Sequence, residues 1–471
     1  MPTEADLMDH RFRYIELSPI YFLAGCFTLA FSGIYILVVP LSSLFWPGDE
    51  FHALEMGILI STMFWPIAIS GLIWGRFIDK YNRVKIFFIV AFARGICLIL
   101  MSFTIMGLGI ISWTYFYILV LIFAIFAGGN YPTVVALAHD LVPEDKRSRF
   151  FGIYNIIRSG FQYIGFVLVG FLVQIGLWQL IFSSIGILII IAGVIMVIKI
   201  KEPKRGIQRQ ELKNVLKKSE VLYDFQIDKK MMKETMLSKT NVVALIEGIF
   251  TSIFLGSLTI LFLPYIQSPP YNISPFSTGV FLAFFGLTGE LIGMVLFAHY
   301  SDKLSKKKSI LRIVFIIISL SVGMITFVFL FFIPLPPLTA EEGKDLSRFM
   351  VDPIVWVMGI IYLLSTSFSA LYNINQPPLL QEINLPEAQG QIIAWNRFLE
   401  QIAWGMGPFI SGIFITISGQ NYQLVSIIIG LFAVPGIILW IFALKWYPED
   451  KEEISKILEQ RSKDLESKVN A

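Results

Sequence analysis

The chain has 471 residues, of which 56% are hydrophobic and 15% aromatic, and only 15% are charged. Soluble domains carry about 25% charged residues, so this composition excludes an ordinary soluble protein. The net charge of +3 excludes no class of partner by itself. Apolar runs of roughly eighteen or more residues recur along the chain, and each is long enough to cross a hydrocarbon core. The sequence therefore predicts a polytopic α-helical membrane protein.

Twelve membrane-spanning helices are predicted, six in each half of the chain. They cover residues 17–44, 54–76, 84–108, 113–140, 149–174 and 177–199, and then 240–265, 276–300, 309–333, 353–381, 390–417 and 421–446. We expect four parts, listed here with their boundaries: an N-terminal six-helix bundle (1–199), a cytoplasmic linker (200–239), a C-terminal six-helix bundle (240–446) and a cytoplasmic tail (447–471). Ile454, Leu458 and Leu465 predict one amphipathic helix in the tail.

The distribution of Lys and Arg predicts the orientation of these spans. Most of the 37 basic residues fall at the ends of spans and in loops that lie on the same side as the N-terminus. The loops of the opposite side contain only Lys344 and Arg348. Because basic loops stay in the cytoplasm, both termini and the linker are expected to be cytoplasmic.

A short polar hinge occurs twice, each time between two apolar spans. The first copy covers 75–85 and contains Asp79 and Arg83; the second covers 298–308 and contains Asp302 and Lys306. Acids and bases at the end of a membrane helix must lie at the water interface. The spans around both hinges also align, which indicates two parallel repeats of six spans, a common design of transporters.

The first hinge resembles the loop signature of the major facilitator superfamily, through Gly75, Asp79, Lys80, Arg83 and Lys85. The resemblance implies an all-α membrane fold of twelve transmembrane helices in two pseudo-symmetric six-helix bundles. Asn82 replaces the second glycine that is usual in the family. We expect the turn to survive, because asparagine tolerates left-handed backbone.

Within the superfamily, residues 79–83, 130–149 and 391–412 are weakly similar to the spinster-like lipid transporters. The charged residues that those proteins place in spans one and four are missing. Ala124 stands where an arginine is usual, and residues 18–45 contain no charge.

The resemblance further implies a gate on the cytoplasmic side. Asp79 would face the beginning of span eleven near Gln391, and Arg83 would pair with Asp140. In the second half, Asp302, Lys306 and Glu382 would form the matching set. The alternative is a basic loop that only sets topology. The predicted gate residues are Gly75, Asp79, Lys80, Arg83, Asp140, Asp302, Lys303 and Glu382.

Six ionisable residues lie within predicted spans, where a charge usually faces a cavity or a partner. They are Arg94, Arg158, Glu247, Glu290, Arg397 and Glu400. Arg397 and Glu400 are three residues apart on one helix and are expected to pair. The resemblance implies that span five packs against span eight, which makes a pair between Arg158 and Glu290 plausible. Alternatively, these charges only fix the register of the helices.

The resemblance also implies that spans one, four, seven and ten line a central cavity. Span ten carries a polar face, and such a face is costly against lipid. Its alternative role is hydrogen bonding between helices. The substrate or ion site is therefore predicted among Arg158, Glu290, Arg397, Glu400, Glu247, Asn130, Tyr131, Tyr372 and Asn373.

These features favour a secondary active transporter of a small organic or amphipathic solute, ion-coupled or facilitative, working by alternating access. We expect a monomer in the plasma membrane, with a small-molecule substrate and the lipid bilayer as partners, and no enzymatic activity, cofactor, metal or nucleic acid. Abundant aromatic residues favour an amphipathic solute, whereas Arg158 and Arg397 would suit an organic anion. Any ion coupling is expected to run through Glu247, Glu290 or Glu400.

The alternative function is that of a polytopic membrane enzyme, such as a lipid-linked group transferase. The longest outer loop, residues 334–352, has acids without catalytic spacing. A phosphate-cradling loop and a nucleophile elbow are also missing from the sequence. Both absences favour the transporter.

Overall fold

The computed structural model describes residues 14–143, 146–203 and 236–470, and every regular element within these ranges is a helix. Twelve stretches among them are long and apolar enough to cross a membrane, which confirms the predicted number of spans. Contacts group the helices into two units. The N-terminal unit lies within residues 1–34 and 66–219, and the C-terminal unit within 35–65 and 220–471.

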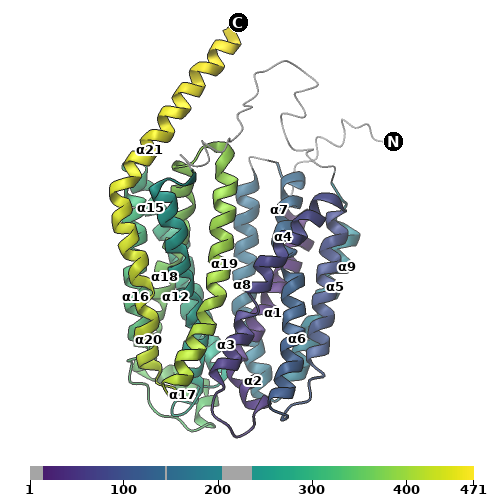
Figure 1. The fold of residues 1–471 in the computed structure, drawn as a ribbon. Helices are drawn as coiled ribbons and strands as arrows, with labels where there is room; N and C mark the ends of the chain where they lie inside the picture. Colours follow the sequence, from purple (N-terminus) through teal and green to yellow (C-terminus); the bar gives the residue numbers. More distant parts are fainter. Residues whose placement is uncertain (1–13, 144–145, 204–235, 471) are drawn as a thin grey trace. The chain divides into compact units, whose positions relative to one another are not determined.

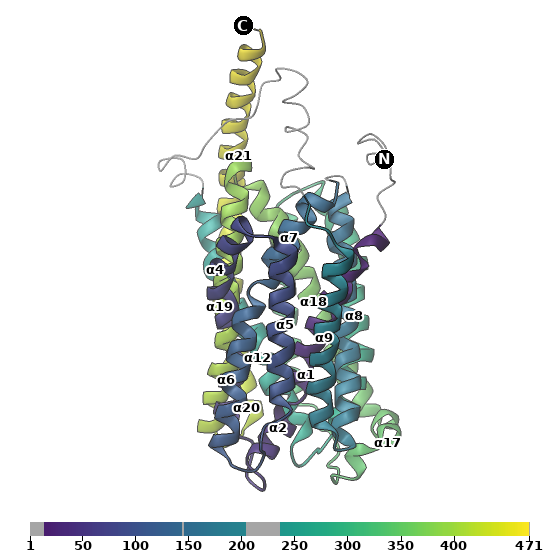
Figure 2. The same cartoon turned by 90° about the vertical axis from the view of Figure 1, so that its right-hand side faces the viewer.

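The N-terminal unit is built from long helices with one short turn of 3₁₀ helix in front of them. They are η1 (Tyr14–Leu17), α1 (Ser18–Ile36), α4 (Trp65–Lys80), α5 (Arg83–Met101), α6 (Ile110–Ala127), α7 (Asn130–Leu141), α8 (Arg147–Gln174) and α9 (Trp178–Lys199). α5 packs against both α9 and α6 (Figure 2). The basic ends of the spans, which we expect to be cytoplasmic, are called the inner ends.

The fourth span is interrupted at two consecutive glycines. α6 ends at Ala127 and α7 begins at Asn130, with Gly128 and Gly129 between them. A Cβ atom at Gly128 would lie 2.8 Å from the backbone nitrogen of Gly71 on α4. Only a glycine permits this approach, so the interruption is where the fourth span contacts the second.

The C-terminal unit holds the remaining helices. They are α2 (Val38–Phe45), α3 (Ala53–Ser61), α12 (Lys239–Gln267), α13 (Pro275–Phe281), the π-helical η4 (Leu282–Leu287), α14 (Thr288–Ile292), the π-helical η5 (Gly293–Phe297), α15 (Ala298–Ser305), α16 (Leu311–Leu330), the 3₁₀ turn η6 (Glu342–Lys344), α17 (Leu346–Val351), α18 (Pro353–Glu382), α19 (Pro386–Ile417), α20 (Tyr422–Leu431) and α21 (Ala433–Asn470).

Two helix pairs organise this unit, as Figure 1 shows: α12 packs along α19, and α16 along α18. Close packing of α12 and α19 requires Gly407, where a Cβ atom would lie 2.4 Å from the carbonyl oxygen of Ile253. Gly407 is thus a point of close contact between these two helices.

Residues 35–65 belong to the C-terminal unit, although they lie in the first two spans. Gly57 packs so closely on α19 that a Cβ atom there would lie 2.6 Å from the carbonyl oxygen of Pro408. The indole nitrogen of Trp65 donates to the carbonyl oxygen of Ile402 at 2.9 Å. The half of span two away from the hinge is therefore joined to span eleven, and α2 at the end of span one contacts α12.

The C-terminal tail continues the last span as one helix, α21, instead of forming a separate element. Ile454 is buried against Leu385, Ala388 and Ile392 at the start of α19, and Leu458 packs beside it. The predicted helical tail is confirmed for these positions, and the side chain of Leu465 lies outside the described residues. Most of the predicted linker, residues 204–235, also lies outside them.

Candidate functional site

A buried ionic cluster ties together the inner ends of spans three and four. Arg83, the first residue of α5, forms an ion pair with Asp140 near the end of α7. Its Nε atom donates to Glu202 at 2.8 Å, and its terminal nitrogens donate to the carbonyl oxygens of Ala136 and Pro203, both at 3.1 Å. Only 5% of the Arg83 side chain is exposed. The predicted pair of Arg83 and Asp140 is confirmed, and Glu202 is an additional partner.

The matching cluster of the C-terminal unit differs from the prediction in its cation. Asp302 lies 3.2 Å from Arg312, the second residue of α16, and not beside Lys306. The same arginine lies 3.6 Å from Glu382, and Lys451 lies 2.6 Å from the other oxygen of Glu382. The expectation for Lys306 is wrong because a longer segment precedes span nine, so that Arg312 takes the place that Arg83 has in the first repeat.

Two further gate candidates of the first hinge, Asp79 and Lys80, are exposed. Asp79 and Lys80 have no ion pair among the described residues, and a Cβ atom at Gly75 would meet nothing within 4 Å. Lys303 in the second hinge is exposed as well. The predicted contact of Asp79 with the start of span eleven stays a prediction, because Asp79 and α19 belong to different units.

Asn82 supports the hinge in another way than expected. Its φ angle is −63°, so it does not adopt left-handed backbone. Its side chain instead accepts a hydrogen bond of 2.8 Å from the backbone nitrogen of Lys85 and caps α5. Asparagine is among the best residues for this position, which explains how the hinge forms without the second glycine.

A fully buried carboxyl group lies in the middle of the C-terminal unit. Glu247 on α12 is 0% exposed and accepts hydrogen bonds from the hydroxyls of Thr251, one turn further along, and Tyr372 on α18, the latter at 3.1 Å. Gln376 donates to the Tyr372 hydroxyl at 3.0 Å. Glu247 stands about 12 Å along α12 from its first residue, within the membrane-spanning helix. Among the described residues, two hydroxyl donors and no cation hold this carboxyl group.

A second acid lies close to Glu247. Glu400 on α19 is 9% exposed and accepts hydrogen bonds from Asn396 at 2.7 Å and from Arg397 at 3.0 Å. The predicted pair of Arg397 and Glu400 is confirmed. Gly248, the residue after Glu247, lies close to Glu400, because a Cβ atom there would lie 3.2 Å from the Cγ atom of Glu400. The two carboxyl groups are therefore neighbours.

Glu290 lies on a short α-helical segment, α14, between two π-helical segments. Such π-helical turns within a membrane helix change the direction of neighbouring side chains and are frequent at functional sites. The hydroxyl of Ser367 on α18 donates to the carbonyl oxygen of Gly289 at 2.9 Å. The expected pair of Glu290 with Arg158 stays a prediction, since the two residues belong to different units.

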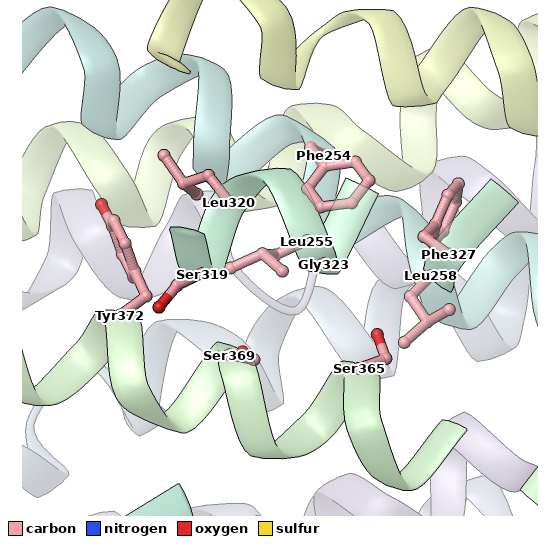
Figure 3. Close-up of a pocket in the computed structure, with 10 residues that line it drawn as sticks. All are labelled: Phe254, Leu255, Leu258, Ser319, Leu320, Gly323, Phe327, Ser365, Ser369 and Tyr372. Atoms are coloured by element: carbon pink, nitrogen blue, oxygen red, sulfur yellow. The ribbon is translucent and has the colours of Figure 1, made fainter. Parts of the chain in front are cut away.

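An apolar cavity adjoins the Glu247 network, between α12, α16 and α18 (Figure 3). The space between its lining side chains is about 390 Å³, part of which is open to solvent. Its lining consists of Phe254, Leu255, Leu258, Ser319, Leu320, Gly323, Phe327, Ser365, Ser369 and Tyr372. Tyr372 thus belongs both to the cavity wall and to the hydrogen-bond network. The polar face of span ten supplies its three lining residues from α18.

The middle of the N-terminal unit contains cations instead of acids. Arg158 on α8 is exposed within its unit and donates from Nε to the hydroxyl of Thr28 on α1 at 3.3 Å. Arg94 on α5 is completely buried. Its guanidinium carbon lies 3.9 Å from the ring centre of Phe27 and 4.3 Å from that of Phe123. Both arginines were singled out from the sequence.

Three other candidates occupy less distinctive positions. Tyr131 is 59% exposed, and Asn373 is exposed with its amide nitrogen bonded to the carbonyl oxygen of Ser369 on its own helix at 3.1 Å. Asn130 begins α7, and its side-chain oxygen is buried without a hydrogen-bond partner in the described structure. Asn130 and Tyr131 belong to the N-terminal unit, so their expected place beside Glu247 and Tyr372 stays a prediction.

The family follows from comparison with known proteins. The sequence profile of the Major Facilitator Superfamily matches residues 20–408. The chain belongs to the Major Facilitator Superfamily. No curated protein sequence matches this member of the superfamily significantly.

Solved structures share the fold of this superfamily member. A bacterial homologue of the human lysosomal transporter Spinster, inward-facing and unoccupied, has a TM-score of 0.68 at 15% identity, covering 93% of this chain and 99% of that one. The POT family transporter PepTSo has a TM-score of 0.67 at 11% identity, covering 94% and 99%. The xylose transporter XylE from E. coli, inward open, has a TM-score of 0.62 at 15% identity, covering 94% and 100%. The predicted fold and the weak similarity to spinster-like proteins are confirmed.

Several residues of the ionic clusters and of the Glu400 site were not predicted from the sequence. Glu202 and Lys451 lie far from their partners in sequence, and no spacing indicates their pairs. Arg312 had a usable signal, because it stands at the start of span nine as Arg83 stands at the start of span three. Asn396 is one turn before Glu400, a spacing at which polar side chains meet on a helix.

Proposed function

We propose that the chain is a secondary active transporter that moves a small organic or amphipathic solute across the plasma membrane by alternating access. Membership of the superfamily and twelve apolar spans support the transporter class. The proposal includes the division into bundles at 1–199 and 240–446, with both termini in the cytoplasm.

The buried carboxyl group of Glu247 is the observation that carries an ion-coupled mechanism. An acid in the interior of a membrane protein is costly, and its default interpretation is a place in an ion or substrate pathway. Glu247 has hydroxyl donors from Thr251 and Tyr372 but no described ion pair. We propose that it binds and releases the coupling proton.

The Tyr372 hydroxyl suits this exchange. A hydroxyl can donate to a carboxylate and accept from a carboxylic acid, so it serves both protonation states of Glu247. The same tyrosine lines the apolar cavity. A solute that enters the cavity and displaces Tyr372 would remove one donor from Glu247, which links solute binding to proton binding.

The ionic clusters at the inner ends are proposed to hold the cytoplasmic gate. Arg83 joins α5 to α7, and Arg312 joins α15, α16 and α18. Asp79 and Lys80 are the exposed members of the gate and are free to form contacts with the other unit during closure. Asp79→Asn should then keep the fold but reduce transport and increase cysteine labelling from the cytoplasmic side. Transport by this variant at the wild-type rate would contradict its gate role.

The proposal is tested with the purified full chain. A thermal-shift screen against metabolite and lipid libraries selects solutes, and each selected solute is then offered to proteoliposomes with and without an imposed pH gradient. We expect at least one solute to be taken up faster than into protein-free liposomes. If no solute that stabilises the protein is transported under any gradient, the transporter proposal is contradicted.

A further inference from the structure

Arg94 is held in an unusual environment for a charged side chain. It is completely buried, and none of its three guanidinium nitrogens has a hydrogen-bond partner in the described part of the chain. Its surroundings are the rings of Phe27, Phe31 and Phe123, at 3.9, 5.6 and 4.3 Å from the guanidinium carbon. Aromatic faces attract the cation but do not satisfy its five N–H groups.

Arg158 stands at the same depth as Arg94. Each is the eleventh residue after the first residue of its helix, Arg83 for α5 and Arg147 for α8. At 1.5 Å per residue, both lie about 16 Å from the inner ends of their helices. Both also border the same part of α1, since Arg158 donates to Thr28 and Arg94 lies over the ring of Phe27, the preceding residue. The two charges are close enough to interact. The two guanidinium groups therefore belong to one cluster.

The N-terminal unit has no acid at this depth to compensate the two charges. Within its described residues the acids are Glu16, Asp79, Asp140 and Glu202, and all four lie at the inner end. Asp140 and Glu202 are already paired with Arg83. A single cation in the middle of a membrane costs about 3 kcal/mol even on the mildest scale, and two repelling cations cost more.

We propose that Arg158 and Arg94 form a binding site for an oxyanion, the carboxylate or phosphate group of the transported solute. This inference rests on the proposed transporter function and specifies its class of solute. Arg158 binds the anion directly, because it is exposed and only its Nε atom is used by Thr28. Its two terminal nitrogens are left for a bidentate contact with a carboxylate or phosphate.

Arg94 acts from behind the aromatic rings in this site. A charge in a medium of low dielectric constant acts over a longer distance than in water. The guanidinium of Arg94 therefore attracts an anion to Arg158 and offsets the loss of its hydration. The ring of Phe31, which is only partly buried, would contact the apolar part next to the anionic group. The solute is thus an organic anion with an apolar body.

The test measures stabilisation of the purified full chain by small matched probes. Benzoate and phenyl phosphate are compared with benzyl alcohol and benzylamine at equal ionic strength in low-chloride buffer. We expect at least one of the two anions to raise the melting temperature by about 2–4 °C. The neutral and cationic probes should leave it unchanged. Benzoate and phenyl phosphate together distinguish a carboxylate site from a phosphate site.

Two variants locate the effect. Arg158→Gln and Arg94→Met should each abolish the shift caused by the anion. Arg149→Gln, which removes an exposed arginine from the inner end of the same helix α8, should keep it. If Arg94→Met does not fold, Arg94→Lys replaces it and should retain the shift, because the charge is kept. A wild-type protein without an anion shift, or a full shift in Arg158→Gln or Arg94→Met, would overturn the site.

The outcome is separable from that of the transporter proposal. If both variants lose the anion shift but no solute is transported, the anion site stands and the transporter proposal fails. If a library solute is transported while both variants keep the anion shift, the transporter stands and the anion site fails.

Discussion

The two units of this transporter place opposite charges at the middle of the same helical frame. Among the described residues, the N-terminal unit carries Arg94 and Arg158 there without an acid, whereas the C-terminal unit carries Glu247 and Glu400, the latter paired with Arg397. The alignment of the repeats puts Arg158 and Glu400 at equivalent places in spans five and eleven. The two repeats therefore share their helices but differ in the charges within them. In the proposed mechanism, the N-terminal unit binds the anion and the C-terminal unit binds the proton.

The inner ends of the two units, in contrast, carry the same kind of ion-pair cluster, but the two clusters differ in burial. At each inner end, the arginine at the start of an apolar span pairs with two carboxylates. Arg83 and Asp140 are 5% and 10% exposed, whereas Asp302 is 53% exposed. A buried pair loses far more than an exposed pair when one partner is removed.

The largest expected effect is on the buried cluster. Arg83→Gln should destabilise the protein by about 3–5 kcal/mol, because it leaves Asp140 and Glu202 without their cation. Thermal unfolding of the purified variant measures this loss. Arg76→Gln is the matched control, since Arg76 is an exposed arginine at the same inner end. A melting temperature of Arg83→Gln equal to that of the control would show that the cluster contributes nothing.

The cluster around Arg312 should lose less stability when its arginine is replaced. Arg312→Gln is expected to cost about 1–2 kcal/mol, because Glu382 keeps Lys451 and the hydroxyl of Tyr447, and Asp302 is hydrated. The same unfolding experiment measures the difference. A loss as large as that of Arg83→Gln would remove the contrast between the two inner ends.

Tyr372→Phe tests the hydrogen-bond network of Glu247 in the C-terminal unit. It removes one donor from Glu247 but keeps the aromatic wall of the cavity. The loss of one hydrogen bond to a charged group is worth about 1.5 kcal/mol, so we expect gradient-driven uptake to fall roughly 10-fold. Uptake into proteoliposomes at a fixed pH gradient measures it. Unchanged uptake would exclude Tyr372 from the coupling.

The smallest effect is expected at Arg397. Its side chain is 57% exposed, so its pair with Glu400 is worth at most about 1 kcal/mol. Arg397→Glu combined with Glu400→Arg should restore both folding and transport if the pair is only structural. A double variant that folds but does not transport would instead place Arg397 in the solute site, and the C-terminal unit would then also bind an anion.

Whether the sequence predicts an interaction depends on how far apart the two residues are along the chain. The twelve spans follow from apolar length, and the pair of Arg397 and Glu400 follows from helical spacing. The pair of Arg83 and Asp140 was implied by the family resemblance. The phenylalanine rings around Arg94 were not predicted, because these side chains come from three different helices. In spans that are almost entirely apolar, no periodicity shows which face of a helix points inward.

The C-terminal network shows the same limit. Thr251 lies one turn from Glu247 on the same helix and was a candidate, but the bond between Glu247 and Tyr372 joins residues 125 positions apart. Arg312 was missed because the hinges were aligned by their acids, and the second hinge is followed by a longer segment.

The central claim is that Glu247 couples solute movement to protons, and one measurement tests it most directly. Proteoliposomes with wild-type protein, Glu247→Gln or the control Glu341→Gln, which alters an exposed loop acid, receive a solute from the library screen. The account predicts that wild type and Glu341→Gln accumulate the solute under a pH gradient. Glu247→Gln should exchange it across the membrane at a similar rate but not accumulate it. Accumulation by Glu247→Gln to the wild-type level would contradict the account.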